Sequence, residues 1–250
     1  PYPFVVVADG RGSSANSHLG AQASCAAVSE LIRSSTCMLR EILDGHDDGV
    51  ADSQWGHLAT MLFEATRTRQ RAIAGERQLS QAELEHTLLL SLWGKRRIAC
   101  LHVGDGAIVL EHNGVDLSVS SAPERGEYAN QTCFVGARTR AEQVRRCLIL
   151  ATDVTGLAAM TDGTAERMLH SQTQKPAPGF SELFKKVRQG TFRERDLLRF
   201  LTETFWEPQV QDDRSLAVLV MQNETLPEID RSKLLLPDRI LHHTQADHIL

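Results

Sequence analysis

The sequence of 250 residues lacks the features that mark membrane proteins, secreted proteins and nucleic-acid-binding proteins. No stretch approaches the roughly twenty consecutive apolar residues that span a bilayer. The opening residues, PYPFVVVADG, have no basic region, and their apolar run is too short for a signal peptide. The net charge of −5 gives no support to nucleic-acid binding, which normally requires a basic face. We therefore expect neither a membrane nor a nucleic acid among its partners.

Sequence signatures of common zinc, nucleotide and disulfide sites are also missing. There is no HExxH motif and no CxxC pair, which argues against a zinc site. The glycine-rich stretch DGRGSS lacks the lysine of a GxxxxGK[ST] loop, so a P-loop is not expected. The five cysteines are odd in number and scattered, which predicts reduced, mostly buried thiols in a cytoplasmic protein. They are Cys25, Cys37, Cys100, Cys133 and Cys147.

The chain does have the composition of a globular protein, with 42% hydrophobic and 24% charged residues. Helical spacing of apolar residues predicts helices over 18–43 and 54–77. Apolar runs joined by the short segments GKR and HNG then predict β-hairpins, and 146–153 reads as a further buried strand. We expect 154–206 to be mainly helical and 214–222 to close the sheet. This pattern predicts an α+β fold in which helices cover antiparallel sheets.

Acidic residues lie next to the apolar runs. Asp9 follows FVVVA, Asp105 follows ACLHVG, Asp153 follows CLILAT, and Asp212 comes two residues before RSLAVLV. Antiparallel strands can bring distant carboxylates together, and carboxylates without histidine or cysteine suit a hard cation such as Mg²⁺ or Mn²⁺. Aspartate beside glycine is also a common turn former. Spacing alone therefore leaves both a metal site and simple turns open.

Four segments of the chain, taken together and in order, match the motifs of one protein family. Any single segment would be weak evidence. They are VVVADGRGSSANSHLGAQAS, HTLLLSLWGKRRIACLHVGDGAIVLEHNG, LILATDVTGL and VQDDRSLAVLVM. In this order they resemble the motifs DGMGG…GExAS, GTTL…VGDSR, LLLxSDGLTD and xxDNxTxxVV. These are motifs of the metal-dependent protein phosphatases of the PP2C (PPM) family, particularly the bacterial members. The similarity extends over residues 4–222.

The resemblance implies an αββα sandwich, in which two antiparallel sheets are flanked by helix pairs. It implies a phosphatase domain over residues 1–222, with 223–250 as a C-terminal extension on the surface or against a partner. The implied activity is hydrolysis of phosphoserine or phosphothreonine on proteins, in bacterial signalling with a partner Ser/Thr kinase. Two Mn²⁺ or Mg²⁺ ions would share a water molecule, lower its pKa and neutralise the phosphoryl oxygens, so that no covalent nucleophile is needed.

The resemblance also assigns the site residues. Asp9 would be the carboxylate that bridges the two metals, and the carbonyl of Gly10 would bind one of them. Asp153 and Asp212 would bind the other metal. Asp105 lies where the family places a ligand of a weaker third metal.

The sequence departs from the family pattern in several places. Glu85, His86 and Thr87 stand where the family has Gly-Thr-Thr, and Val154 replaces a glycine. Family members begin with two strands that carry an arginine and an Asn-x-Asp motif, and this chain starts after them. We therefore expect the native gene to encode residues before Pro1 that contain both features.

Arg11, two residues after Asp9, leaves two interpretations open. Its guanidinium could grip the phosphoryl group through two hydrogen bonds and partly substitute for the missing arginine. It could equally fold onto a surface carboxylate. The larger alternative is a catalytically silent module that binds a phosphoprotein or a kinase. The retained aspartates favour the enzyme, because clustered carboxylates repel one another without metal, whereas the missing hairpin favours the module.

Overall fold

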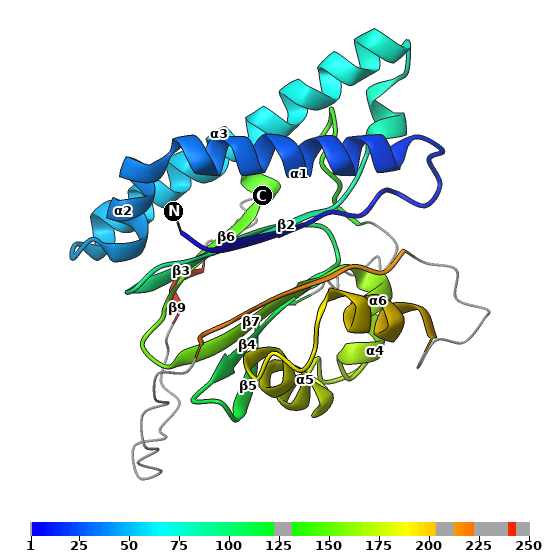
Figure 1. The fold of residues 1–250 in the computed structure, drawn as a ribbon. Coiled ribbons are helices and arrows are strands. Elements are labelled where there is room, and N and C mark those ends of the chain that lie inside the picture. The colour runs from blue at the N-terminus through cyan, green and yellow to red at the C-terminus, as the bar shows by residue number, and fades with distance from the viewer. Residues whose placement is uncertain (1, 123–131, 204–212, 223–239, 244–250) are drawn as a thin grey trace.

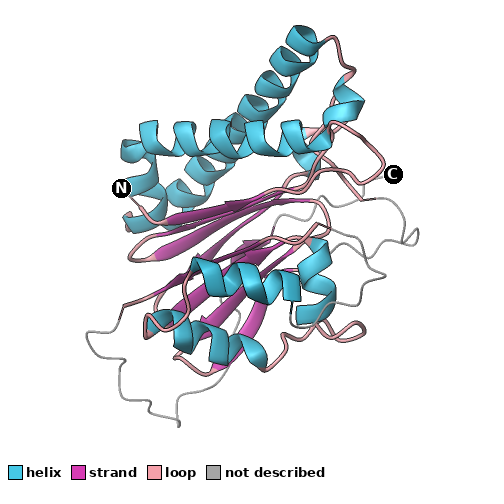
Figure 2. Cartoon of the chain, turned by 45° about the vertical axis from the view of Figure 1, so that its right-hand side comes forward, coloured by secondary structure: helices cyan, strands magenta, loops and turns pink. Residues whose placement is uncertain are grey.

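Two antiparallel β-sheets lie face to face, with helices over the outer face of each (Figure 1, Figure 2). The structure, a computed structural model, describes residues 2–122, 132–203, 213–222 and 240–243. The first sheet has the order β1-β2-β3-β6-β9, formed by Phe4–Val7, Leu88–Trp93, Arg97–Val103, Arg145–Leu150 and Ile240–His243. The second has the order β5-β4-β7-β8, formed by Asp116–Ser121, Ala107–His112, Val154–Met160 and Leu216–Val220.

The described helices form the two outer layers of the sandwich. The first sheet is covered by α1 Ser17–Ser34, α2 Thr36–Asp44 and α3 Asp48–Arg77. The second is covered by α4 Asp162–Met168, α5 Gly179–Arg188 and α6 Glu194–Glu203. Two short 3-10 helices are η1 Gln81–Leu84 and η2 Ala141–Gln143. The predicted α+β sandwich with two antiparallel sheets is therefore confirmed.

Apolar side chains fill three layers of core: one between the two sheets, and one between each sheet and its helices. Every residue of β2 and β3 is buried, because the first sheet has helices on one face and the second sheet on the other. Strands buried on both faces have no need to alternate apolar and polar residues. This burial explains the unbroken run LLLSLW in the sequence.

The predicted hairpin turns are present. Gly94 N–H donates to the Arg97 carbonyl at 2.9 Å and closes the turn between β2 and β3. Asn113 and Gly114 have φ angles of 52° and 73° and connect β4 to β5. Positive φ at both central residues is what a two-residue hairpin turn of the favoured twist requires, and Asn-Gly supplies it at low cost.

The helix predicted over 18–43 is interrupted at Ser35. The hydroxyls of Ser34 and Ser35 both donate to the Leu31 carbonyl, at 2.9 and 2.7 Å. Such bonds compete with the backbone bonds that would continue the helix. The helix predicted over 54–77 begins earlier, at Asp48, because the Asp47 side chain accepts the Val50 N–H at 2.9 Å and caps it.

The prediction that 154–206 is mainly helical is wrong at its start. Val154–Met160 forms β7, an interior strand of the second sheet, and helices begin only at Asp162. All seven residues of β7 are buried. Its sequence VTGLAAM has neither alternation nor a clear helical period, so the pattern did not identify a strand.

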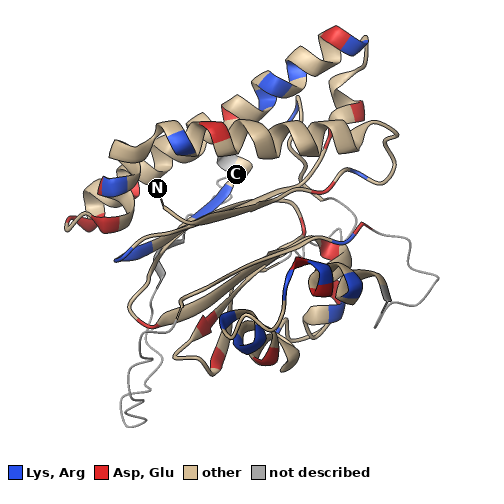
Figure 3. Ribbon diagram, in the orientation of Figure 1, with Lys and Arg blue, Asp and Glu red and all other residues tan. Residues whose placement is uncertain are grey.

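Part of the predicted C-terminal extension joins the first sheet. Ile240–His243 forms β9, which pairs antiparallel with β6 at its edge. Residues 223–239 and 244–250 lie outside the described residues, so the boundary at residue 222 stays a prediction. Charged residues lie mostly on the helices and at strand ends (Figure 3). No helix in the described ranges is long and apolar enough to cross a membrane.

Gly20 lets α1 approach the segment that leads into β2. A Cβ at this position would lie 2.1 Å from the Leu84 carbonyl oxygen, which is backbone and cannot move cheaply. We expect Gly20→Ala to lower the free energy of unfolding by about 1–3 kcal/mol, in spite of the higher helix propensity of alanine.

Gly75 in α3 is the matched control, since a Cβ added to it would meet no described atom within 4 Å. Gly75→Ala should be neutral or stabilising by up to about 1 kcal/mol. Urea unfolding of both variants measures the difference. Equal free energies of unfolding for the two variants would show that the close approach at Gly20 does not contribute to stability.

Candidate metal centre

The strand register places Asp9 and Asp105 at the same end of the sandwich. Val7, the last residue of β1, pairs with Leu89, and Leu88 pairs with Val103, the last residue of β3. Asp9 and Asp105 each follow these strands by two residues. We call this end of the two sheets the site end.

Asp9 is held by backbone pairing that continues beyond β1. Its N–H donates to Thr87 Oγ1 at 3.1 Å, and its carbonyl accepts the Thr87 N–H at 2.7 Å. Only 7% of Asp9 is exposed. Gly10 forms a β-bridge with His86, and a Cβ at Gly10 would lie 2.9 Å from the backbone carbon of Ser17 at the start of α1. A larger residue would push α1 away from the site end.

Asp105 lies where the chain crosses from the first sheet to the second. Gly104 before it has φ 117°, a conformation that L side chains rarely adopt. Gly106 after it packs against β7, since a Cβ there would lie 2.3 Å from the Met160 carbonyl. The Asp105 carboxylate accepts a hydrogen bond from Thr132 Oγ1 at 2.6 Å.

The second sheet brings Asp162 to the site end, a residue that the sequence analysis missed. Met160, the last residue of β7, pairs with Ala107, the first residue of β4. Asp162 follows two residues later and begins α4. Thr161 Oγ1 accepts the Ser215 N–H at 3.0 Å and donates to the Asp213 carbonyl at 3.3 Å. These bonds fasten the start of α4 to the segment that leads into β8.

A signal for Asp162 was present in the sequence. Asp9, Asp105 and Asp162 each stand before a glycine and each follow an apolar run, whereas Asp153 stands before Val154. Because β7 is a strand, Asp162-Gly163 follows the end of a strand in the same way as Asp9-Gly10 and Asp105-Gly106.

Asp153, a predicted metal ligand, lies away from the site end. It occupies the turn between β6 and β7, beyond Leu150, which pairs with Arg97 at the far end of the first sheet. A strand of six or seven residues separates the two ends by roughly 20 Å. There the Asp153 carbonyl accepts the Asn113 N–H at 2.8 Å, and its carboxylate lies 3.5 Å from His112 Nδ1. These two contacts are those of a turn that packs against the β4–β5 hairpin.

Asp212, the remaining predicted ligand, lies outside the described residues. The carbonyl of the next residue, Asp213, accepts a hydrogen bond from Thr161 at the site end. The assignment of Asp212 therefore stays a prediction, and its place in the chain is next to a residue of the site end.

Arg11 folds onto a carboxylate in this structure. One terminal nitrogen of its guanidinium lies 2.6 Å from Glu85 Oε2. The backbone N–H of Arg11 also donates to the Glu85 backbone carbonyl at 2.9 Å. The guanidinium also lies over the Phe134 ring, 5.5 Å from its centre. The Arg11 side chain is 44% exposed, so this contact is open to solvent. Of the two interpretations of Arg11, the structure shows the second.

His86 adds no charge to the site end. Burial lowers its pKa to about 4, so the ring is neutral at neutral pH. Its Nδ1 lies 2.8 Å from the Leu84 carbonyl, which places the N–H on that nitrogen. The ring therefore supports the segment that pairs with Gly10 without repelling a cation.

The chemistry of the site-end donors fits a hard divalent cation. Asp9, Asp105 and Asp162 offer carboxylate oxygens, and Gly10 offers a carbonyl; these are the ligand types that Mg²⁺ and Mn²⁺ prefer. Among the described residues, no group of three or more His, Cys, Asp or Glu side chains is arranged to hold an ion by itself. A site built here would therefore use backbone carbonyls and water, or Asp212, in addition.

Comparisons with known proteins agree with this architecture. The sequence model of the family described as protein phosphatase 2C matches residues 2–202. No curated protein matches the chain. The structure of PppA, a key regulatory component of the T6SS in Pseudomonas aeruginosa, is similar over 86% of this chain and 84% of that chain, with 16% identity and a TM-score of 0.51. A bacterial serine phosphatase is similar over 90% and 88%, with 10% identity and a TM-score of 0.50. At these identities the structures show a shared fold.

Proposed function

Because the chain belongs to the protein phosphatase 2C family, we propose that it is a Mn²⁺- or Mg²⁺-dependent protein serine/threonine phosphatase. Its substrate would be a phosphorylated protein, and a Ser/Thr kinase would be its partner enzyme in signalling. The proposal rests on one observation: three Asp-Gly pairs lie at the same end of the sandwich. Asp9 and Asp105 follow strands of the first sheet, and Asp162 follows a strand of the second.

The ligands that we propose are Asp9, the carbonyl of Gly10, and Asp162 in place of Asp153. Asp212 and Asp105 keep the roles that the resemblance gives them, in the second site and in a weaker third site. Divalent ions held here would lower the pKa of a water molecule and neutralise the phosphoryl oxygens of the substrate.

The chain itself contributes a site that is formed in advance. Two hydrogen bonds to Thr87 fix the backbone of Asp9, and Thr161 ties the Asp162 segment to the start of β8. Groups held in this way need little rearrangement when substrate binds, which is how positioning lowers a reaction barrier.

A silent module that binds a phosphoprotein or a kinase is the second candidate function. The ion pair between Arg11 and Glu85 favours it, since the arginine nearest to Asp9 in the sequence is occupied. Hydrolysis of p-nitrophenyl phosphate with Mn²⁺, and its loss with EDTA, distinguishes the two. Binding of a phosphopeptide with no metal-dependent turnover would establish the module.

The first prediction separates Asp162 from Asp153. Asp162→Asn should lower metal-dependent turnover by about 100-fold or more, because it removes one negative charge from the proposed ion site. The fold should be kept, since the Asn oxygen can still accept the Gly163 N–H that Asp162 accepts at 2.9 Å. It should also reduce the rise in melting temperature that Mn²⁺ causes.

Asp153→Asn is the matched control and should change turnover by no more than about twofold, since Asp153 lies at the far end of the sheets. Loss of turnover in Asp153→Asn with full turnover in Asp162→Asn would restore the assignment made from the sequence.

The second prediction concerns phosphate recognition by Arg11. A half-exposed ion pair is worth at most about 1 kcal/mol, so a phosphoryl dianion can compete with Glu85 for the guanidinium. We expect Arg11→Ala to lower kcat/KM for a phosphopeptide by about 10- to 100-fold. Glu85→Gln should lower KM, because it weakens the competing pair. If neither variant changes KM or kcat, Arg11 serves only to hold Glu85.

A further inference from the structure

Cys100 and Cys147 lie directly opposite each other in the first sheet. They are register partners on the neighbouring antiparallel strands β3 and β6. Directly opposite residues in such a pair have Cα atoms about 4.5 or 5.5 Å apart. Both distances fall within the range of about 4.4–6.8 Å that a disulfide allows. The Cα separation expected for this pair is therefore compatible with a disulfide.

The two thiols already interact. Both side chains point into the core between the sheets and are almost fully buried. The interaction with Cys147 lowers the pKa of Cys100, and the interaction with Cys100 raises the pKa of Cys147. Ser91 Oγ lies 3.5 Å from the Cys100 sulfur. Cys100 is thus the thiol that ionises more readily, and thiolate is the reactive form.

A small cavity of about 10 Å³ opens beside the pair. Its lining residues include both cysteines together with His102, Ser120, Ser121, Arg145 and Arg146. Arg145 is partly exposed and donates to His102 Nε2 at 3.0 Å and to the Gly104 carbonyl at 2.6 Å. A cavity of this size has room for about one water molecule. Hydrogen peroxide is longer than water but similar in width and polarity, so it could reach this opening, and the neighbouring guanidinium favours a thiolate.

We propose that Cys100 and Cys147 are a redox modification site that hydrogen peroxide converts to a reversible disulfide. The Cys100 thiolate attacks one peroxide oxygen, the O–O bond breaks, and the departing hydroxide takes a proton to become water. Cys100 is then a sulfenic acid. The Cys147 sulfur attacks the Cys100 sulfur, the S–O bond breaks, and the leaving hydroxide becomes water with the proton that Cys147 releases. Two thiols are oxidised by two electrons in total, and one peroxide is reduced to two waters.

The site differs from the exposed thiol of the chain. Cys37 is exposed on α2 and lies outside this pair, so it should report simple solvent access. The Cys100–Cys147 pair instead depends on the register of β3 and β6. It also lies two residues along the strands from His102 and Arg145, and Arg145 donates to His102 and to the Gly104 carbonyl just before Asp105.

The experiment uses the folded 250-residue chain. The protein is exposed to hydrogen peroxide without denaturant, quenched with acid, unfolded, and treated with N-ethylmaleimide, and its peptides are mapped by mass spectrometry without reduction. We expect the free thiols to fall by two from the five of the sequence. We also expect one linked peptide pair that contains Cys100 and Cys147, and dithiothreitol should restore both thiols.

Two variants and one further outcome complete the test. Cys37→Ser should leave the linked pair unchanged. Cys147→Ser should abolish it and leave Cys100 as a sulfenic acid that reacts with dimedone. If Cys147→Ser fails to fold, the peptide map of the unaltered chain decides alone. Recovery of Cys100 and Cys147 as alkylated thiols, under conditions that oxidise Cys37, would overturn the proposal, as would a linked pair that forms only in denaturant.

Discussion

The pairing of β4 with β7 is the constraint on which the site end depends. The chain leaves the first sheet at Gly104, crosses at Asp105, and enters the second sheet at Ala107, which pairs with Met160. The absence of a side chain at Gly106 lets the two strands meet, since a Cβ would lie 2.3 Å from the Met160 carbonyl. A slip of one residue would turn every side chain of β7 to the opposite face. The register shift in this pair lies at Glu111 and His112, at the far end, and leaves the site end regular.

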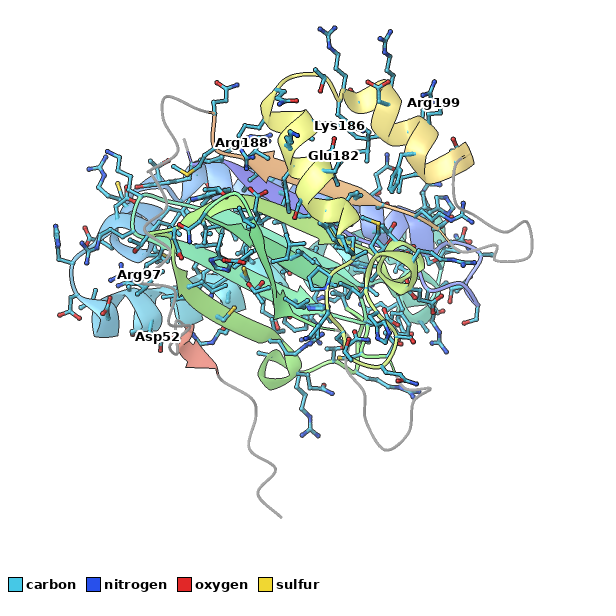
Figure 4. The ribbon with its side chains drawn as sticks, turned by 90° about the horizontal axis from the view of Figure 1, so that it is seen from below. Asp52, Arg97, Glu182, Lys186, Arg188 and Arg199 are labelled. Carbon is cyan, nitrogen blue, oxygen red and sulfur yellow. The ribbon has the colours of Figure 1, made fainter. Side chains whose placement is uncertain are left out.

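Buried charges fasten the helical layers to the sheets. Glu111 of β4 is fully buried, pairs with Arg188 of α5, and accepts the Thr155 hydroxyl at 2.7 Å. In the other layer, the buried Arg97 donates to the Ile42 and Gly45 carbonyls at the end of α2 and pairs with Asp48 at the start of α3. Figure 4 shows Arg188 on α5, and Arg97 beside the helices of the opposite layer.

These ion pairs have more influence on how the helices are arranged than on the net stability of the fold. A buried ion pair recovers little beyond its desolvation cost, but a helix that left one charge unpaired would lose several kcal/mol. We infer that these pairs select one placement of α5, α2 and α3 among those that the apolar core would accept.

The local chemistry of the sequence was enough to predict the turns, most strands and two of the site-end aspartates. Asn113-Gly114 and Gly94 have backbone roles that their residue types specify, and the apolar runs of β2 and β3 are long enough to read as strands. The wrong prediction of helix at the start of 154–206 has a physical origin. VTGLAAM is small, buried on both faces and without alternation, so its strand character comes from its neighbours β4 and β8 and not from its own pattern. Asp153 was assigned because LILATDVTGL resembles a family motif, and the Asp162-Gly163 pair that follows β7 was not considered. The contact of Arg11 with Glu85 joins residues 74 positions apart, and no local pattern could select it over solvent.

The sheets and three threonine side chains position the site-end aspartates. Thr87 holds the backbone of Asp9, Thr132 donates to the Asp105 carboxylate, and Thr161 anchors the segment that carries Asp162. Each of these three contacts is made by a threonine hydroxyl, which supplies a hydrogen bond without adding charge. The nearby cation Arg11 is paired with Glu85, and His86 is neutral. The fold thus places the strand ends of three aspartates at one end of the sandwich, and neither the neutral His86 nor the paired Arg11 adds an uncompensated positive charge beside them.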